Sequence, residues 1–78
     1  MDHSVTQLKE GEFGTVRCFT DERMAGKLMT MGVLPGSKVQ VVRIAPFNGG
    51  YYLKVDGTNM VLREAEADSI VLEVLADS

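Results

Sequence analysis

Residues 27–46, KLMTMGVLPGSKVQVVRIAP, constrain the fold of this chain more than any other stretch. Gly32 predicts the end of a helix, because glycine accepts the left-handed backbone that other residues resist at that position. Pro35 and Gly36 predict a type II turn, which requires a fixed φ followed by a positive φ. A β-branched strand then begins at Lys38. The chain therefore reverses from helix to strand here, and Gly32, Pro35 and Gly36 are backbone determinants rather than contact residues.

The helix before this turn is predicted over residues 21–31. Thr20 offers a hydroxyl cap at its start, and acidic residues in the first turn favour the positive end of the helix dipole. Three apolar residues at i, i+4 and i+7 predict a buried stripe: Met24, Leu28 and Met31. Met29 is displaced from that stripe and is expected to be more exposed.

Five short strands are predicted from the alternation of apolar and polar residues. They span residues 14–19, 38–45, 51–55, 59–62 and 70–74. A parity switch between Val41 and Val42 predicts a bend or bulge in the second strand. Asp56 and Gly57 predict a tight hairpin between the third and fourth strands, which makes Gly57 a further backbone determinant. Residues 63–68 are long enough for only one or two helical turns.

The number and length of these elements predict the architecture. A chain of 78 residues makes one domain, and five short strands cannot form two full packed sheets at this length. A small barrel closed on itself, with the main helix plugging one end, is the economical solution. We therefore predict one mainly β domain over residues 1–78, in which residues 1–7 are a flexible N-terminal segment. Cys18 alternates with Val16 and is expected to be a small buried hydrophobe.

Composition and charge exclude several classes of protein. No apolar run exceeds three residues, which excludes a membrane-spanning helix, and the first residues do not begin a signal peptide. We expect a soluble, cytoplasmic protein without direct membrane insertion. The net charge is −3, and the seven basic residues from Arg17 to Arg63 are spread without interleaved aromatic residues. Nucleic acid is therefore not an expected partner.

Residues with the chemistry for catalysis or metal binding are few. His3 is the only histidine and lies near the N-terminus, and the sequence contains no nucleophile–base set and no phosphate-binding loop. The one cluster with metal-ligand character is Glu64, Glu66 and Asp68, whose carboxylates would suit a divalent cation. We favour a solvated acidic turn at a helix start as its explanation. We therefore predict that the chain is not an enzyme and holds no resident metal or cofactor.

The order of these signals resembles the bacterial ferrous-iron transport protein A family, FeoA. The matching features are the helix end and turn of residues 28–36, Ala45-Pro46, Asp56-Gly57 ahead of Leu62-Arg63, and Ala67 followed by Ile70. The resemblance covers residues 8–74. It departs from the family at Phe47-Asn48-Gly49-Gly50, where a short Gly-Asp-Pro-like turn is usual. An SH3-like barrel is the fold that this resemblance implies.

The resemblance also implies a function. It points to a small cytoplasmic accessory protein of bacterial ferrous-iron uptake, which binds the FeoB-type membrane transporter at its cytoplasmic GTPase region. The alternative is a metal-dependent regulatory barrel like the C-terminal domain of iron-dependent transcriptional repressors. Whether the chain associates with itself stays open.

A docking surface is expected at four large side chains: Leu28, Met29, Phe47 and Tyr52. Methionine adapts to an opposing surface, and tyrosine adds apolar area with a polar tip. The alternative that Leu28 and Met29 both belong to the core stays open. Arg63, from the Leu-Arg pair of the resemblance, either braces the barrel or faces a partner, and we favour bracing.

Overall fold

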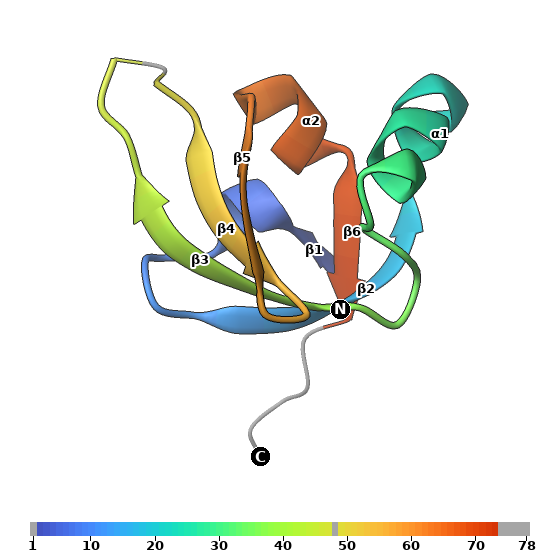
Figure 1. Cartoon of the computed structure of the whole chain (residues 1–78), viewed down its shortest axis with the longest axis horizontal. Coiled ribbons are helices and arrows are strands. Elements are labelled where there is room, and N and C mark those ends of the chain that lie inside the picture. The colour runs from blue at the N-terminus through green and yellow to red at the C-terminus, as the bar shows by residue number, and fades with distance from the viewer. Residues whose placement is uncertain (1, 48, 74–78) are drawn as a thin grey trace.

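The fold is a single curled antiparallel sheet with its helices gathered at one end (Figure 1). The computed structural model describes residues 2–47 and 49–73. The elements are β1 Asp2–Ser4, η1 Val5–Gln7, β2 Phe13–Phe19, α1 Glu22–Thr30, β3 Lys38–Ile44, β4 Tyr51–Val55, β5 Thr58–Leu62, α2 Glu64–Asp68 and β6 Ile70–Glu73. The strand order is β1-β6-β2-β3-β4-β5. The predicted mainly β fold with one main and one short helix is confirmed, with six strands instead of five.

The helix α1 begins and ends through local hydrogen bonds. Asp21, and not Thr20 as expected, caps its start, because its carboxylate accepts from the N–H groups of Arg23 at 2.8 Å and Met24 at 3.3 Å. A carboxylate satisfies two free donors at once and also favours the positive end of the helix.

At the other end of α1, Gly32 adopts a φ of 103°. Its N–H donates to the Met29 carbonyl at 3.0 Å, and the Val33 N–H donates to the Leu28 carbonyl at 2.9 Å. These two bonds form a Schellman motif, so the predicted helix end at Gly32 is confirmed. Met31 caps the helix and is 40% exposed, so its expected place in the buried stripe is wrong.

The turn after α1 also follows the sequence prediction. The Ser37 N–H donates to the Leu34 carbonyl at 2.8 Å across Pro35 and Gly36, and Gly36 has a φ of 94°. A positive φ at the third position of a turn is the mark of type II. The turn places β3 directly against β2.

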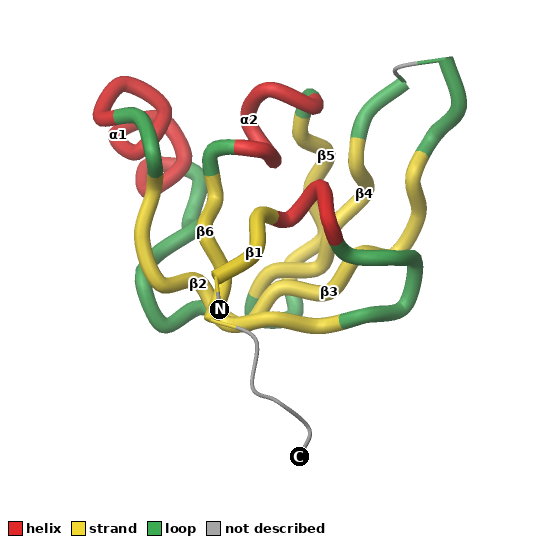
Figure 2. Tube along the Cα trace, turned by 180° about the vertical axis from the view of Figure 1, so that it is seen from behind, coloured by secondary structure: helices red, strands yellow, loops and turns green. Residues whose placement is uncertain are grey.

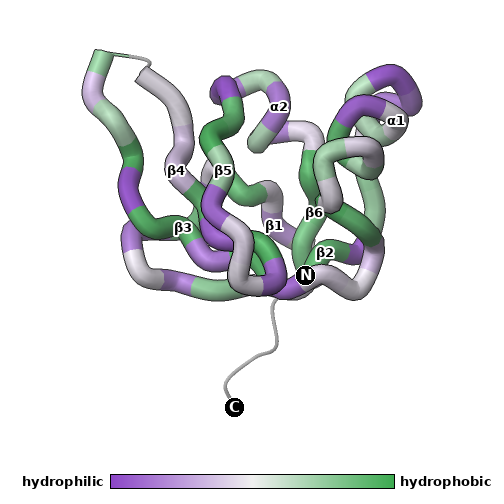
Figure 3. Tube along the Cα trace, in the orientation of Figure 1, coloured by the Kyte–Doolittle hydropathy of each residue, from purple (hydrophilic) through white to green (hydrophobic). Residues whose placement is uncertain are grey.

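The core lies inside the curl of the sheet and is closed by α1, α2 and η1. Its buried apolar residues are Val5, Leu8, Val16, Leu28, Val33, Val39, Val41, Leu53, Val55, Leu62, Ala67, Ile70 and Leu72. Apolar and polar residues alternate along much of the sheet (Figure 3). Leu28 has no exposed surface, so its expected role as a docking residue is wrong: a side chain without accessible area cannot contact a partner.

Two β-bulges decide which side chains leave the core. In β3 the pairing with β4 shifts between Val41 and Arg43, which confirms the predicted bulge, and Val42 is 50% exposed. In β2 the pairing with β6 shifts between Val16 and Cys18. The extra residue reverses the alternation beyond Val16, so Cys18 is exposed and its expected burial is wrong.

The N-terminal residues form part of the sheet. Residues 1–7 were expected to be flexible, but β1 pairs antiparallel with β6 and η1 follows it (Figure 2). Val5 is fully buried in the core, and the Ser4 N–H donates to the Gln7 side-chain oxygen at 2.8 Å. The expectation is therefore wrong for residues 2–7, because burial of Val5 and pairing with β6 compensate for the entropy of ordering them.

The hairpin of β4 and β5 is the element that the sequence predicted most directly. Asp56 and Gly57 both have positive φ, 49° and 87°, as a type I′ turn requires. The pairing runs without a bulge from Val55 opposite Thr58 to Tyr51 opposite Leu62. Val74, which the predicted last strand included, lies outside the described residues. Of the helices that the structure describes, none is long and apolar enough to cross a membrane.

Candidate docking surface

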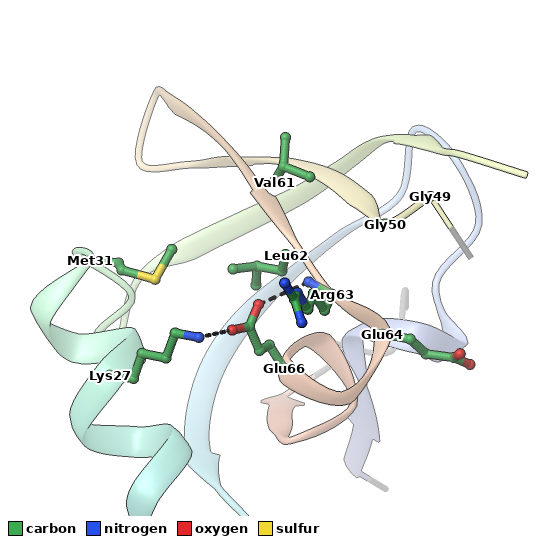
Figure 4. A pocket seen from close by; sticks show the side chains of 9 residues that line it. All are labelled: Lys27, Met31, Gly49, Gly50, Val61, Leu62, Arg63, Glu64 and Glu66. Carbon is green, nitrogen blue, oxygen red and sulfur yellow. Dashed lines mark hydrogen bonds and ion pairs between the residues drawn. The ribbon is translucent and has the colours of Figure 1, made fainter. Parts of the chain in front are cut away.

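A hollow of about 660 Å³ lies between α1, the end of β5 and the start of α2 (Figure 4). Its lining combines charged side chains, apolar side chains and the backbone of two glycines: Lys27, Met31, Gly49, Gly50, Val61, Leu62, Arg63, Glu64 and Glu66. The hollow is open to solvent, and its lining comes from segments that are distant in the sequence. Only folding brings these residues together.

Glu66 fixes the base of the hollow. Its carboxylate forms an ion pair with Lys27, and it also accepts from the Arg63 N–H at 2.9 Å. The Glu66 side chain is only 8% exposed, whereas Lys27 is 60% exposed. The hydrogen bond from Lys27 and then that from the Arg63 N–H lower the pKa of the Glu66 carboxyl below its usual value. Glu66 thus braces α2 against α1.

Arg63 takes part in this bracing mainly through its backbone. Its N–H caps the start of α2 by donating to Glu66, and its positive charge adds a smaller lowering of the Glu66 pKa. The Arg63 residue itself is exposed at the mouth of the hollow. Bracing and contact with a partner are therefore compatible roles for Arg63.

Four large apolar residues lie at the surface beside the hollow, and we call them the apolar strip: Met31, Val42, Tyr52 and Val61. They are 40%, 50%, 41% and 51% exposed. Tyr52 and Val61 are direct partners across β4 and β5. A second hollow of about 330 Å³ is lined by Val42, Tyr52 and Val61, and Val61 also lines the first hollow together with Met31. Val61 therefore borders both hollows, and Met31 lies across the first hollow from it (Figure 4).

The four residues of the predicted docking surface do not come together. Tyr52 belongs to the apolar strip, whereas Leu28 is in the core. Met29 is 42% exposed but lines neither hollow. Phe47 is 98% exposed, lies in the loop between β3 and β4 with a φ of 57°, and also lines neither hollow.

Three residues of the apolar strip were not predicted from the sequence: Met31, Val42 and Val61. Val61 was identifiable in principle, because it alternates with buried Leu62 and the short hairpin places it opposite Tyr52. Val42 is displaced by the bulge and Met31 by the helix end. Apolar spacing alone does not predict that either side chain faces solvent.

The acidic cluster of the sequence separates in the structure. Glu66 turns to α1, while Asp68 accepts from the Ser4 hydroxyl at 3.3 Å and the Thr6 hydroxyl at 3.0 Å. Glu64 points away from Glu66 (Figure 4). Across residues 2–47 and 49–73, no three His, Cys, Asp or Glu side chains are grouped so that they could hold a metal ion.

We expect Glu66→Gln to flatten the acid limb of the stability profile. Because the folded-state pKa of Glu66 is lowered, its contribution is complete above the unfolded value of about 4.3 and is lost as pH falls through the lower folded value. At pH 7 the variant should lose about 1.5–3 kcal/mol of unfolding free energy, the usual range for hydrogen bonds to a charged group. Urea unfolding between pH 7 and pH 3 measures both effects.

Asp56 supplies the internal control for this experiment. The Lys38 N–H and then the Ser37 hydroxyl lower the pKa of the Asp56 carboxyl, and this group is present in both proteins. The difference between the pH profiles of the original protein and the Glu66→Gln variant therefore reports the contribution of Glu66 alone. Parallel profiles would contradict the bracing role of Glu66.

Comparison with known proteins assigns the family. The sequence profile of the FeoA domain matches residues 3–74. The FeoA protein from Chlorobium tepidum is 26% identical with a TM-score of 0.83, over 96% of this chain and 72% of that chain. The zinc complex of FeoA from Stenotrophomonas maltophilia, an SH3 domain protein, is 24% identical with a TM-score of 0.76, over 90% of this chain and 88% of that chain.

A manganese-dependent transcriptional repressor contains the same fold. It is 21% identical with a TM-score of 0.83, over 95% of this chain but only 42% of the repressor chain. The predicted SH3-like fold is confirmed by the Stenotrophomonas maltophilia protein, and the predicted family is confirmed by the domain match. With 72 of its 78 positions inside that match, the chain belongs to the FeoA domain family, which is linked to ferrous-iron uptake.

Proposed function

We propose that this chain is a non-catalytic cytoplasmic accessory module that binds a FeoB-type ferrous-iron transporter at its cytoplasmic GTPase region. The family membership supports the link to ferrous-iron transport. The single observation that carries the binding role is the apolar strip of Met31, Val42, Tyr52 and Val61. A small domain that exposes several large apolar side chains around a hollow has the usual features of a protein-binding site.

The composition of the strip suits a protein partner. Tyr52 offers a large flat ring with a polar tip, and Met31 offers a flexible side chain that adapts to an opposing surface. Lys27 and Arg63 stand at the mouth of the adjoining hollow. An apolar centre with a charged rim is the common anatomy of protein interfaces. Met29 and Phe47 are exposed outside the strip and would extend the contact only with a large partner.

We expect the double variant Tyr52→Asp and Val61→Asp to bind the purified transporter at least roughly tenfold more weakly, because two buried carboxylates would oppose desolvation of the interface. Both residues are half exposed in the free protein, but they lie directly opposite each other, so repulsion between the two carboxylates should lower the melting temperature somewhat, and binding is compared at a temperature at which both proteins are folded. Surface-immobilised transporter with this chain in solution gives the affinity, and thermal unfolding gives the stability.

The matched control is Phe13→Asp, because Phe13 is 52% exposed in β2, outside the strip. Its affinity should equal that of the original protein. Equal affinities of the double variant and the control would show that the transporter contacts another surface. Met29→Asp and Phe47→Asp would then test the remaining predicted residues.

The alternative function, a metal-dependent regulatory barrel, has a likeness of fold as its only support. The similarity to the manganese-dependent repressor is 21% in sequence and covers less than half of that protein. We therefore retain the accessory role as the proposal.

A further inference from the structure

We propose that the free edge of β5 receives an extended, acidic segment of a partner protein as an additional strand of the sheet. This inference rests on the proposed function for the identity of the partner, and on the backbone of β5 for the mode of binding. It specifies that main-chain hydrogen bonds supply the contact and that the apolar strip receives the side chains of the added strand.

The backbone of β5 has unpaired groups on one side. Among the strands of residues 2–47 and 49–73, β5 ends the strand order and pairs only with β4. In a two-residue hairpin the pair that flanks the turn, Val55 and Thr58, is hydrogen-bonded, and bonded pairs then alternate along the ladder. The N–H and C=O groups of Asn59 and Val61 therefore point away from β4. None of the turn and loop hydrogen bonds within the described part of the chain involves them.

The edge lacks the usual protection against strand addition. Natural edge strands carry charges, proline or bulges that prevent pairing. β5 reads TNMVL, without charge or proline, and it pairs with β4 in continuous register. Thr58, Asn59 and Val61 are exposed. The opposite edge of the sheet, β1, is only three residues long and includes Asp2.

Charge selects an acidic segment. β3, β4 and β5 contain three basic residues, Lys38, Arg43 and Lys54, and no Asp or Glu. Lys54 lies directly opposite Asn59, and Arg43 lies directly opposite Tyr52. Of the three basic residues, Lys54 on the neighbouring strand β4 lies nearest a strand added beside β5, and Lys38 and Arg43 on β3 lie one strand further across this basic and apolar face. Alternating acidic and apolar residues would complement it, whereas basic residues would be repelled.

The space beside β5 favours one thin segment over a second copy of this chain. Lys27 of α1 and Met31, which caps this helix, form the opposite wall of the hollow at the end of β5 (Figure 4). A single strand needs about 4.8 Å of width, whereas the edge of a second barrel brings its own helices. We therefore assign the edge to an extended peptide segment.

Amide hydrogen exchange of Asn59 and Val61 tests the mode of binding directly. The probe is a synthetic peptide of about eight residues, the length of an ordinary strand, that alternates valine and glutamate. We expect both amides to exchange rapidly in the free protein and to become protected roughly tenfold or more with the peptide. The same peptide with lysine in place of glutamate should give no protection. If the acidic peptide also gives none at millimolar concentration, the proposal is overturned.

Asn59→Pro removes one outward donor while leaving the apolar strip intact. Proline is tolerated on an edge strand where the N–H faces solvent, so the variant should fold, and its affinity for the acidic peptide should be roughly tenfold weaker. Asn59→Ala keeps the N–H and should bind as the original protein does. If Asn59→Pro does not fold, hydrogen exchange in the original protein still decides the question. Equal affinity in a folded Asn59→Pro variant would overturn the proposal.

The cytoplasmic region of a FeoB-type transporter, used as a second probe, separates the two proposals. Transporter binding without protection of Asn59 and Val61 would overturn strand addition and leave the proposed function standing. Protection by the acidic peptide without any transporter binding would support strand addition and overturn the proposed function. Protection that rises with the concentration of this chain alone would identify a second copy as the occupant and overturn the assignment to a partner segment.

Discussion

Replacing Leu28 with Ala is expected to lower the free energy of unfolding by about 2–5 kcal/mol, the range for truncating a buried leucine. Leu28 has no exposed surface and belongs to the core, and its carbonyl also accepts the Val33 N–H that ends α1. The core of a domain this small cannot close a new cavity without moving α1. Because the total stability of a domain is only about 5–15 kcal/mol, this loss should be visible as a much lower urea midpoint.

Met29→Ala is the matched control for Leu28→Ala. Met29 is the next residue of the same helix and is 42% exposed, so its truncation should change the free energy of unfolding by no more than about 0.5 kcal/mol. The two variants share the helix and the type of substitution and differ in burial. Equal midpoints for the two would contradict the assignment of Leu28 to the core.

Leu28 and Met29 illustrate what apolar spacing can predict. The i, i+4 spacing of Met24 and Leu28 correctly indicated the inward face of α1, because both residues lie within one helix. The helix end at Gly32, the type II turn and the β4–β5 hairpin were predictable for the same reason. Each depends on the backbone preferences of two or three adjacent residues.

Features that depend on distant partners were not predictable. Burial of Val5 depends on β1 pairing with β6, at the other end of the described chain. Exposure of Cys18 depends on a bulge against that same strand. The bulge of β3 was marked by a switch of apolar parity, whereas the short pattern around Cys18 has no such switch and is the same whether the residue faces in or out.

The candidate site is also a product of distant contacts. The ion pair of Lys27 with Glu66 joins residues that are 39 positions apart, and it braces α2 against α1. Sequence analysis placed Glu66 in an acidic cluster because its neighbours are acidic. In the folded chain its main partner is basic, and the cluster does not exist as a unit.

Gly50→Ala should produce the other large loss of stability. Gly50 has a φ of 107°, a region that costs other residues about 1–3 kcal/mol. An added Cβ would also lie 3.0 Å from the Leu62 carbonyl oxygen and 3.2 Å from Val61 Cγ1. The carbonyl belongs to the backbone and cannot rotate away. We therefore expect a loss above that strain range, measured as a lower urea midpoint.

Gly32→Ala separates backbone strain from close approach. Gly32 has a φ of 103°, nearly that of Gly50, but an added Cβ there would meet no atom within 4 Å. Its loss should therefore reflect strain alone and be smaller than that of Gly50→Ala. Equal losses would mean that β5 can move away from Gly50 without cost. A larger loss at Gly50 would instead mean that this glycine holds the start of β4 tightly against Val61 and Leu62, and so positions the end of β5 that borders the hollow.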